Sequence, residues 1–184
     1  MQPLAIDTLP TPNPHALMFK VAVPLVARGT YEYRNAAAAE TAPLARRLFT
    51  LDGVDQILVT SRFVTVNKHG AFDWPSLVPD IKGLIREHVD SGDPAVAAGH
   101  AVEALDTDSE LARQVAELIE EEIRPSLARD GGDVQFVGLT EDNVVQVRLI
   151  GACASCPSST ATLSLGIEAF IVEEFPDVAG VIQV

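Results

Sequence analysis

Residues 151–159 read Gly-Ala-Cys-Ala-Ser-Cys-Pro-Ser-Ser and contain both cysteines of the 184-residue chain, Cys153 and Cys156. This stretch follows a segment that alternates like a strand, residues 144–150, and precedes a segment with helical spacing that begins near Pro157. Backbone N–H groups and the dipole at a helix N-terminus favour anions, so we expect both thiols to ionise readily. The sequence therefore predicts a strand-loop-helix unit that presents two thiolates.

Two thiolates at this spacing have three common uses: half of a four-ligand metal site, two ligands of an iron-sulfur cluster, or a redox-active dithiol. A pair of inert buried cysteines is the remaining interpretation, but Gly151 before the pair and Pro157 after it are loop-forming residues that core cysteines do not need. With two cysteines in all, the chain has no disulfide framework of the kind found in small secreted domains.

The number of available ligands separates these uses. A zinc site or an iron-sulfur cluster usually has four protein ligands, whereas this chain offers two cysteines. The four histidines lie outside the segment around the cysteines, and each is expected to be an ordinary loop or core residue: His15, His69, His88 and His100. A metal centre therefore requires two chains, and twofold dimers are the commonest oligomers.

The sequence on either side of residues 151–159 predicts an α-β-β-α-β order. An S/T-x-x-E capping pattern at 107–110 opens a long amphipathic helix, and Pro125 is expected to interrupt it. The segment 130–133, Asp-Gly-Gly-Asp, ends this helix. Two strands then form a hairpin, the cysteines and a second helix follow, and a final strand closes the chain; the strands are expected at 134–139, 144–150 and 178–184.

Two features of the C-terminal half of the chain have two interpretations each. The Asp130–Asp133 segment either stops the helix with a glycine at positive φ or contacts the loop that carries the cysteines. The acidic helix face of Glu117, Glu120, Glu121 and Glu122 is either a solvated surface or a docking site.

The N-terminal half predicts a second small domain. We expect a strand at 16–23, an Ala-rich helix at 36–49, strands at 54–60 and 62–67, and a helix from Asp73 to about Ser91 with His88 and Trp74 in the core. Residues 91–106 are small, polar or acidic and are interpreted as a linker.

Charge and hydropathy exclude several classes of protein. The chain has 13 Lys and Arg against 26 Asp and Glu, and its net charge of -13 argues against binding to nucleic acid or to anionic membranes. No run of eighteen apolar residues could span a bilayer, and the N-terminus resembles neither a signal sequence nor a transit peptide. We expect a protein of the bacterial cytoplasm, or of the mitochondrial matrix if a presequence has been removed.

The chain resembles a known family along nearly its whole length. Residues 107–184 are similar to the NifU C-terminal-like domain, the Nfu iron-sulfur scaffold module, and residues 10–90 are similar to the N-terminal domain of the same proteins. The motifs that carry the resemblance are Ile123-Arg-Pro125, Asp130-Gly-Gly-Asp133 and Gly151–Leu163 in the first region, and Thr11-Pro-Asn-Pro14, Asp52-Gly-Val54, Phe63-Val-Thr-Val66 and Asp73-Trp74 in the second.

This resemblance implies two small α+β domains, at 10–90 and 107–184, joined by the linker 91–106. It also implies that Cys153 and Cys156 of two protomers hold a 4Fe-4S cluster between them, with a 2Fe-2S form as an optional intermediate. Upstream iron-sulfur assembly proteins would load the homodimer, and apo-proteins would accept the cluster. Such a carrier is not an enzyme.

The rival interpretations are a CxxC thiol oxidoreductase, active as an iron-free monomer, and an interaction module in which a zinc ion joins two chains. The N-terminal domain shows no catalytic constellation, and we expect it to recognise acceptors or regulate access to the cluster. The chain departs from the family pattern at Ser155, where Gly is usual, and at Met18, where Lys is usual.

Overall fold

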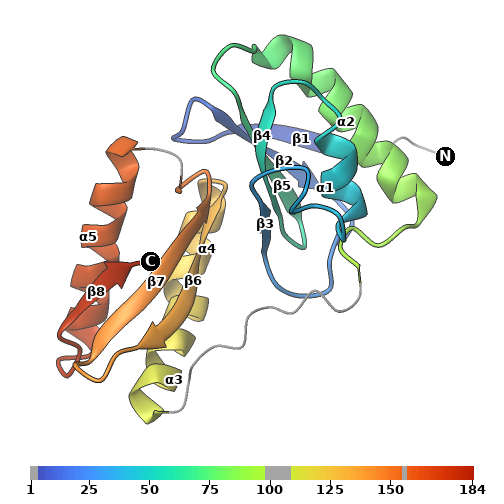
Figure 1. Cartoon of the computed structure of the whole chain (residues 1–184). Coiled ribbons are helices and arrows are strands. Elements are labelled where there is room, and N and C mark those ends of the chain that lie inside the picture. Colours follow the sequence, from blue (N-terminus) through green and yellow to red (C-terminus); the bar gives the residue numbers. More distant parts are fainter. Residues whose placement is uncertain (1–3, 98–108, 155–156) are drawn as a thin grey trace. The chain divides into compact units, whose positions relative to one another are not determined.

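The computed structural model describes residues 4–97, 109–154 and 157–184, with the backbone alone for residues 157–163. The chain divides into two compact units, residues 1–102 and 103–184, and each has its own sheet and core (Figure 1). Both units combine helices with a sheet, so the predicted α+β class is confirmed. Within the described ranges, no helix has the length and apolar character needed to cross a bilayer.

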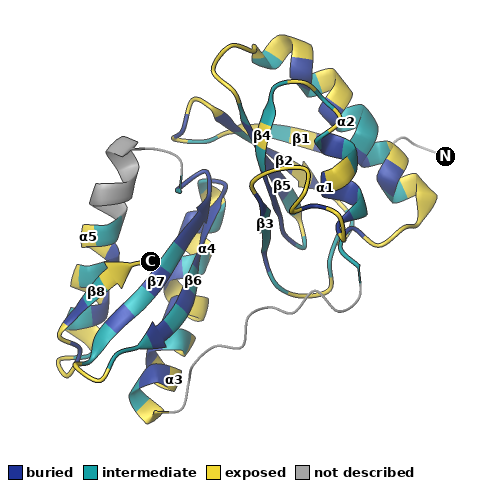
Figure 2. Cartoon of the chain, in the orientation of Figure 1, coloured by how far each residue is buried: buried dark blue, intermediate teal, exposed yellow. Residues whose placement is uncertain are grey.

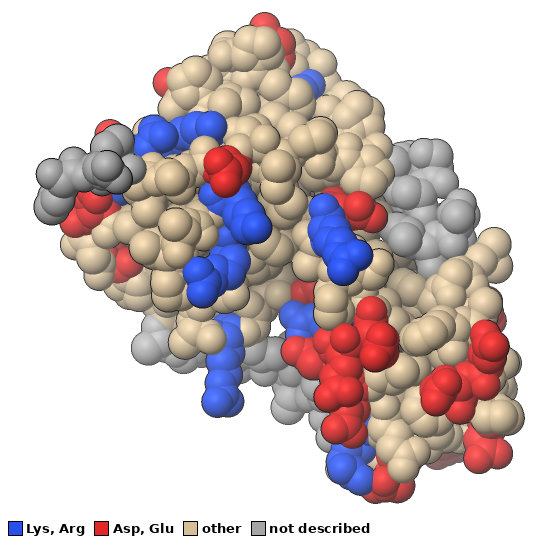
Figure 3. Space-filling view, turned by 180° about the vertical axis from the view of Figure 1, so that it is seen from behind, with Lys and Arg blue, Asp and Glu red and all other residues tan. Residues whose placement is uncertain are grey.

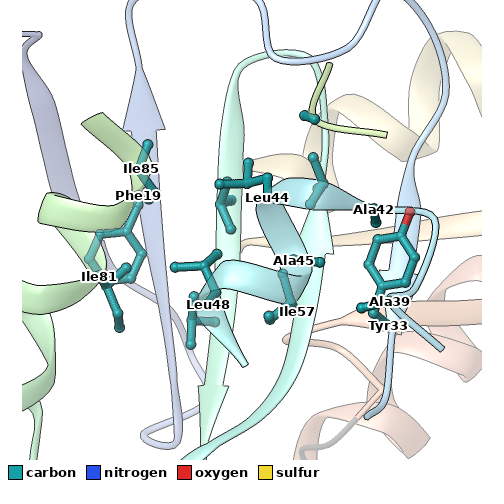
Figure 4. Close-up of a cluster of buried hydrophobic side chains, with 14 of the residues drawn as sticks. Phe19, Tyr33, Ala39, Ala42, Leu44, Ala45, Leu48, Ile57, Ile81 and Ile85 are labelled. Carbon is teal, nitrogen blue, oxygen red and sulfur yellow. The ribbon is translucent and has the colours of Figure 1, made fainter. Parts of the chain in front are cut away.

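The first unit contains a five-stranded antiparallel sheet in the order β1-β2-β5-β4-β3. Two helices, α1 and α2, pack on one face of this sheet (Figure 4). Leu48 of α1 and Ile81 of α2 contribute to the same core as Phe19 of β2 and Ile57 of β4, and all four side chains are fully buried. The elements are β1 Ile6–Pro10, β2 Ala16–Val21, β3 Tyr31–Tyr33, α1 Pro43–Leu48, β4 Val54–Val59, β5 Phe63–Lys68 and α2 Trp74–Ser91.

The helix predicted at 36–49 is too long at its N-terminal end. Helix α1 begins only at Pro43, because a proline disfavours helical geometry in the residue before it, and Ala42 has φ -123° and ψ 86°. Residues before that point form turns instead, and the Asn35 side chain accepts a 2.8 Å hydrogen bond from the Ala38 N–H. Strands β1 and β3 were not predicted.

The first residues of the expected linker pack on the first unit. Ala95 is buried in its core, and its carbonyl accepts a hydrogen bond from the Leu44 N–H. The Ala97 N–H donates to the Thr41 carbonyl at 2.8 Å. Residues 98–106 lie outside the described part of the chain, so the linker and the domain boundaries remain predictions.

The second unit has the predicted α-β-β-α-β order, with a three-stranded sheet β6-β7-β8 in which β6 and β7 are antiparallel and β7 and β8 are parallel. Buried residues follow β6 and β7, and the helices pack on one face of the sheet (Figure 2). The elements are α3 Glu110–Leu118, η1 Ile119–Ile123, α4 Arg124–Arg129, β6 Gly132–Leu139, β7 Val144–Gly151, α5 Pro157–Glu174 and β8 Gly180–Gln183.

The predicted interruption near Pro125 takes the form of a π-helical turn, η1. Pro125 has no N–H to donate to the preceding turn, and the Arg124 N–H bonds to the Ile119 carbonyl five residues back. The helix starts two residues later than expected: the Ser109 side chain caps α3 by accepting a 3.0 Å hydrogen bond from the Ala112 N–H. Thr107, the expected cap, lies outside the described residues.

Candidate iron-sulfur site

The cysteine loop, residues 151–156, leads from the end of β7 to the start of α5. Gly151 has φ 72°, a left-handed conformation that favours glycine, and the Ala154 N–H donates to the Gly151 carbonyl at 3.2 Å. The chain therefore turns sharply at the end of β7 and places Cys153 at 4% exposure in the core of the second unit. Cys156 lies outside the described residues.

The Asp130–Asp133 segment packs directly against this loop. Gly132 pairs with Gly151 across β6 and β7, and the Ala152 N–H donates to the Gly131 carbonyl at 3.2 Å. A Cβ atom placed on Gly132 would lie 2.3 Å from the Sγ of Cys153. Gly132 therefore provides the space that the thiol occupies.

The same segment also ends the preceding helix. Gly131 has φ 74° and follows Asp130, the C-cap of α4. Both interpretations of the Asp130–Asp133 segment therefore hold: one glycine stops the helix, and the next borders a predicted ligand.

An ion pair joins the start of β6 to the start of helix α4. Arg124 donates two hydrogen bonds to the carboxylate of Asp133, at 2.8 and 2.6 Å, and the Asp133 side chain is 6% exposed. Asp133 also accepts a 2.8 Å hydrogen bond from the Val134 N–H, and Arg124 bonds to Glu120 as well. The hydrogen bonds from Arg124 to Asp133 raise the pKa of Arg124, while its partial burial opposes this shift. The pair holds the residue next to Gly132 in place.

The acidic helix face is exposed to solvent, which fits either interpretation of it. Glu117, Glu120, Glu121 and Glu122 are all exposed, and the second unit presents acidic side chains with few basic ones among them (Figure 3). Glu120 pairs with Arg124, as described above. These carboxylates do not form a metal site: the described residues contain no group of three or more His, Cys, Asp or Glu side chains that could hold a metal ion.

The histidines that the structure describes lie in the first unit. His88 is 1% exposed on α2, as predicted, whereas His15 and His69 are exposed. His100 lies outside the described residues. Burial, together with the nearby charge of Arg47, lowers the pKa of His88, and the charge of Asp93 opposes this shift.

In the first unit, the Thr11–Pro14 motif forms a hydrogen-bonded loop that is tied to a helix. The Asn13 side chain accepts a 2.9 Å hydrogen bond from the His15 N–H, and the Trp74 indole N–H donates to the Pro14 carbonyl at 3.1 Å. Trp74 is only partly buried, but it packs on the core at the start of α2 as predicted. The motif therefore has a structural explanation.

Two contributions to the site were not predicted from the sequence. Arg124 carries no signal of its pairing with Asp133, which lies nine residues further along the chain. The closeness of Gly132 to Cys153 depends on the pairing of β6 with β7, and the sequence offered only the double glycine as a signal.

Comparison with known proteins shows which families and relatives the chain is similar to. Residues 6–92 match the family described as "Scaffold protein Nfu/NifU N terminal", and residues 115–182 match "NifU-like domain". The chain is 40% identical to "NifU-like protein 5, mitochondrial" of Arabidopsis thaliana over 97% of its own length and 67% of that protein. It is 40% identical to the human "NFU1 iron-sulfur cluster scaffold homolog, mitochondrial" over 97% of its own length and 71% of that protein.

Proposed function

Because the chain belongs to the Nfu/NifU-like iron-sulfur cluster scaffold family, we propose that it carries a 4Fe-4S cluster between two protomers and delivers it to apo-proteins. Cys153 and Cys156 of each protomer are the proposed ligands. The observation that carries this proposal is that the Asp130–Asp133 segment packs on the cysteine loop, with Gly132 beside the Sγ of Cys153, so that two motifs of the family resemblance meet in one place.

The ligand count supports a cluster shared by two chains. A 4Fe-4S cluster commonly takes four thiolates, and the chain contains two cysteines. Two copies related by a twofold axis supply the required four. A 2Fe-2S cluster fits the same four ligands and is the proposed intermediate during loading.

Transfer would proceed by exchange of thiolates at iron. A cysteine thiolate of the acceptor binds one iron as the Cys153 or Cys156 thiolate leaves it, and each remaining iron follows in the same way. The total charge and the oxidation state of the cluster do not change, so no further reactant is needed. The protein makes and breaks no bond within an organic substrate, which is why we propose a carrier and not an enzyme.

The low exposure of Cys153 restricts how an acceptor can approach. Cys153 is 4% exposed and Gly132 borders its Sγ, so β6 covers one side of this thiol. An acceptor thiolate, like an upstream assembly protein, is therefore expected to approach Cys153 from a side that β6 does not cover. The N-terminal domain, with a separate core, is proposed to recognise acceptors.

Two compartments were predicted, and the names of the relatives favour one of them. The Arabidopsis and human proteins are both named as mitochondrial, which supports a mitochondrial location over the bacterial cytoplasm. The chain spans about two thirds of the Arabidopsis relative.

A transfer assay tests this proposal. The full chain is reconstituted anaerobically with iron and sulfide, repurified, and mixed with an apo 4Fe-4S enzyme whose activity depends on its cluster. We expect activity to appear faster than with equal amounts of free iron and sulfide, and to appear even with a chelator that captures free iron. Activity that the chelator abolishes, or a repurified chain without iron, would contradict the proposal.

The proposed role of the N-terminal domain has its own test. The same assay is run with residues 103–184, which form a compact unit with its own core. We expect slower delivery to at least one of several acceptors. Unchanged delivery to every acceptor would remove acceptor recognition from the first unit and leave the carrier function of the second unit intact.

A further inference from the structure

Helix α5, which follows the cysteine loop, has apolar residues on two sides. Ile167 and Ile171 lie in the core of the second unit at 5% and 0% exposure. Leu165 and Phe170 point away from that core and are 66% and 42% exposed. Large apolar residues exposed on the side opposite the core are typical of a helix face that another surface covers.

The exposed apolar residues form one continuous patch. Leu165 and Ala169 are four residues apart, as are Gly166 and Phe170, so these two pairs are neighbours on the helix surface. All four residues are exposed, and we call them the outer α5 patch. The two small residues lie between the two large ones, which allows a second helix to approach closely.

Charge distinguishes this patch from the rest of the second unit. Residues 91–184 contain four Lys and Arg against seventeen Asp and Glu, yet residues 149–167 contain no charged residue at all. Two copies of a strongly acidic domain repel each other wherever acidic faces meet. The four residues of the outer α5 patch carry no charge, so they offer a second copy a contact without that repulsion. The nearest exposed carboxylate further along the same face is Glu173, about one turn beyond Ala169.

We propose that the outer α5 patch packs against the same patch of a second copy of this chain, and that this contact brings the two cysteine loops together. The inference rests on the proposed function, since a cluster with two ligands per chain is incomplete without a second copy. A twofold contact is self-complementary, which an uncharged patch of large and small residues satisfies. Helix α5 begins one residue after Cys156, and Leu165 lies about 12 Å further along its axis. The proposal places the twofold axis roughly along α5, so that the two helices run parallel and their N-terminal ends lie at the same end of the contact.

Charged substitutions in the patch test this inference in the full chain. Leu165→Glu and Phe170→Glu place a carboxylate where two copies would meet, and Leu165→Gln is a milder variant. Ile182→Glu is the matched control, because Ile182 is an exposed apolar residue of the same unit at 45% exposure and lies outside the patch. Each protein is reconstituted anaerobically, checked by circular dichroism, and examined by analytical ultracentrifugation with iron and sulfide counted in the same sample.

We expect the wild-type chain and Ile182→Glu to form cluster-containing dimers. We expect Leu165→Glu and Phe170→Glu to fold but to dimerise at least about tenfold more weakly and to lose cluster on dilution. Leu165→Gln should have an effect between those of the wild-type chain and Leu165→Glu. Glu variants that remain dimers with full cluster content would overturn the patch as the interface while leaving the proposed function in place. The same is true if they remain dimers but fail only in transfer, because the patch would then dock an acceptor. A wild-type chain that takes up no cluster would instead overturn the proposed function itself.

Discussion

Gly132 and the Sγ of Cys153 are so close that a Cβ atom at residue 132 would lie 2.3 Å from the sulfur. The same atom would lie 3.0 Å from the Cys153 Cβ and 3.1 Å from the Ile150 carbonyl oxygen, so a side chain at residue 132 would force the Cys153 side chain or the backbone around it to shift. Gly132 is not one of the glycines with a positive φ. The position therefore requires the absence of a side chain and not the backbone freedom of glycine. The shape of the site thus depends on the absence of a side chain at Gly132, which is not itself a proposed ligand.

Gly132→Ala is expected to displace Cys153 and weaken cluster binding. The overlap with sulfur forces the cysteine loop or β6 to shift, at a cost of about 1–3 kcal/mol in the free energy of unfolding. Urea unfolding and the rate of cluster loss to a chelator measure the two effects. Gly83→Ala in α2 is the control, because an added Cβ there meets nothing within 4 Å and alanine favours a helix. Cluster loss at the wild-type rate in Gly132→Ala would show that the contact is unimportant.

Arg124→Met is expected to destabilise the second unit by about 2 kcal/mol, since it leaves the buried carboxylate of Asp133 without its cation. Asp133→Asn keeps the side-chain shape but removes the charge, and the double variant should cost less than the sum of the two single ones. The Glu120→Gln control removes only an exposed partner of Arg124 and should change stability by less than about 0.5 kcal/mol. If the loss of stability in the double variant equals the sum of the losses in the two single variants, Arg124 and Asp133 are not energetically coupled.

His88 is expected to make the first unit less stable as the pH falls below about 6.5. Its pKa is lowered in the folded chain, and neither ring nitrogen has a hydrogen-bond partner among the described residues. The unfolded chain therefore binds a proton at a higher pH than the folded chain does. The stability due to neutral His88 is complete above the unfolded pKa and is lost as the pH falls toward the folded one, by at most about 1.4 kcal/mol per pH unit.

His88→Leu should remove this pH dependence. Unfolding is followed between pH 7.5 and 5.5 by the fluorescence of Trp74, the chain's one tryptophan, which packs on the same core. His69→Gln alters an exposed histidine and should retain the wild-type slope. If His88→Leu and the wild-type chain lose stability equally over this range, the effect belongs to another group.

The long periodic elements of the fold could be predicted because each carries its own signals. Helix α2 begins at the Asp73 cap and ends at Gly92, which has φ 71°, and β4 and β5 are rich in valine and other apolar residues. Strands β1 and β3 could not be predicted, because Ile6–Pro10 contains a proline and Tyr31–Tyr33 has only three residues. Both lie at the edges of the sheet, where pairing with a neighbour and not the local pattern makes a strand.

For the candidate site, the sequence located the cysteine loop but not its surroundings. The two cysteines are close in sequence, and their spacing indicates metal or redox chemistry. The contacts of Cys153 with Gly132, and of Arg124 with Asp133, join residues from different elements. A register shift between Phe136 and Gly138 in the pairing of β6 with β7 influences which residues meet, and local periodicity does not reveal it.

Cys153→Ala and Cys156→Ala are each expected to abolish stable cluster binding, because a cluster shared by two copies would lose two of its four ligands. Cluster content is measured from the visible absorption and the iron count after anaerobic reconstitution and gel filtration. Ala154→Ser, which alters the same loop and keeps both cysteines, should retain the cluster. A single-cysteine variant with a full cluster would refute the assignment of that residue.

The most direct test of the central claim is native mass spectrometry of the anaerobically reconstituted full chain, with iron, sulfide and zinc counted in the same sample. We predict a dimer with about two iron and two sulfide ions per chain and no zinc. An iron-free monomer that cycles between dithiol and disulfide would contradict the account and identify a thiol oxidoreductase. A dimer that contains zinc in place of iron and sulfide would contradict it equally.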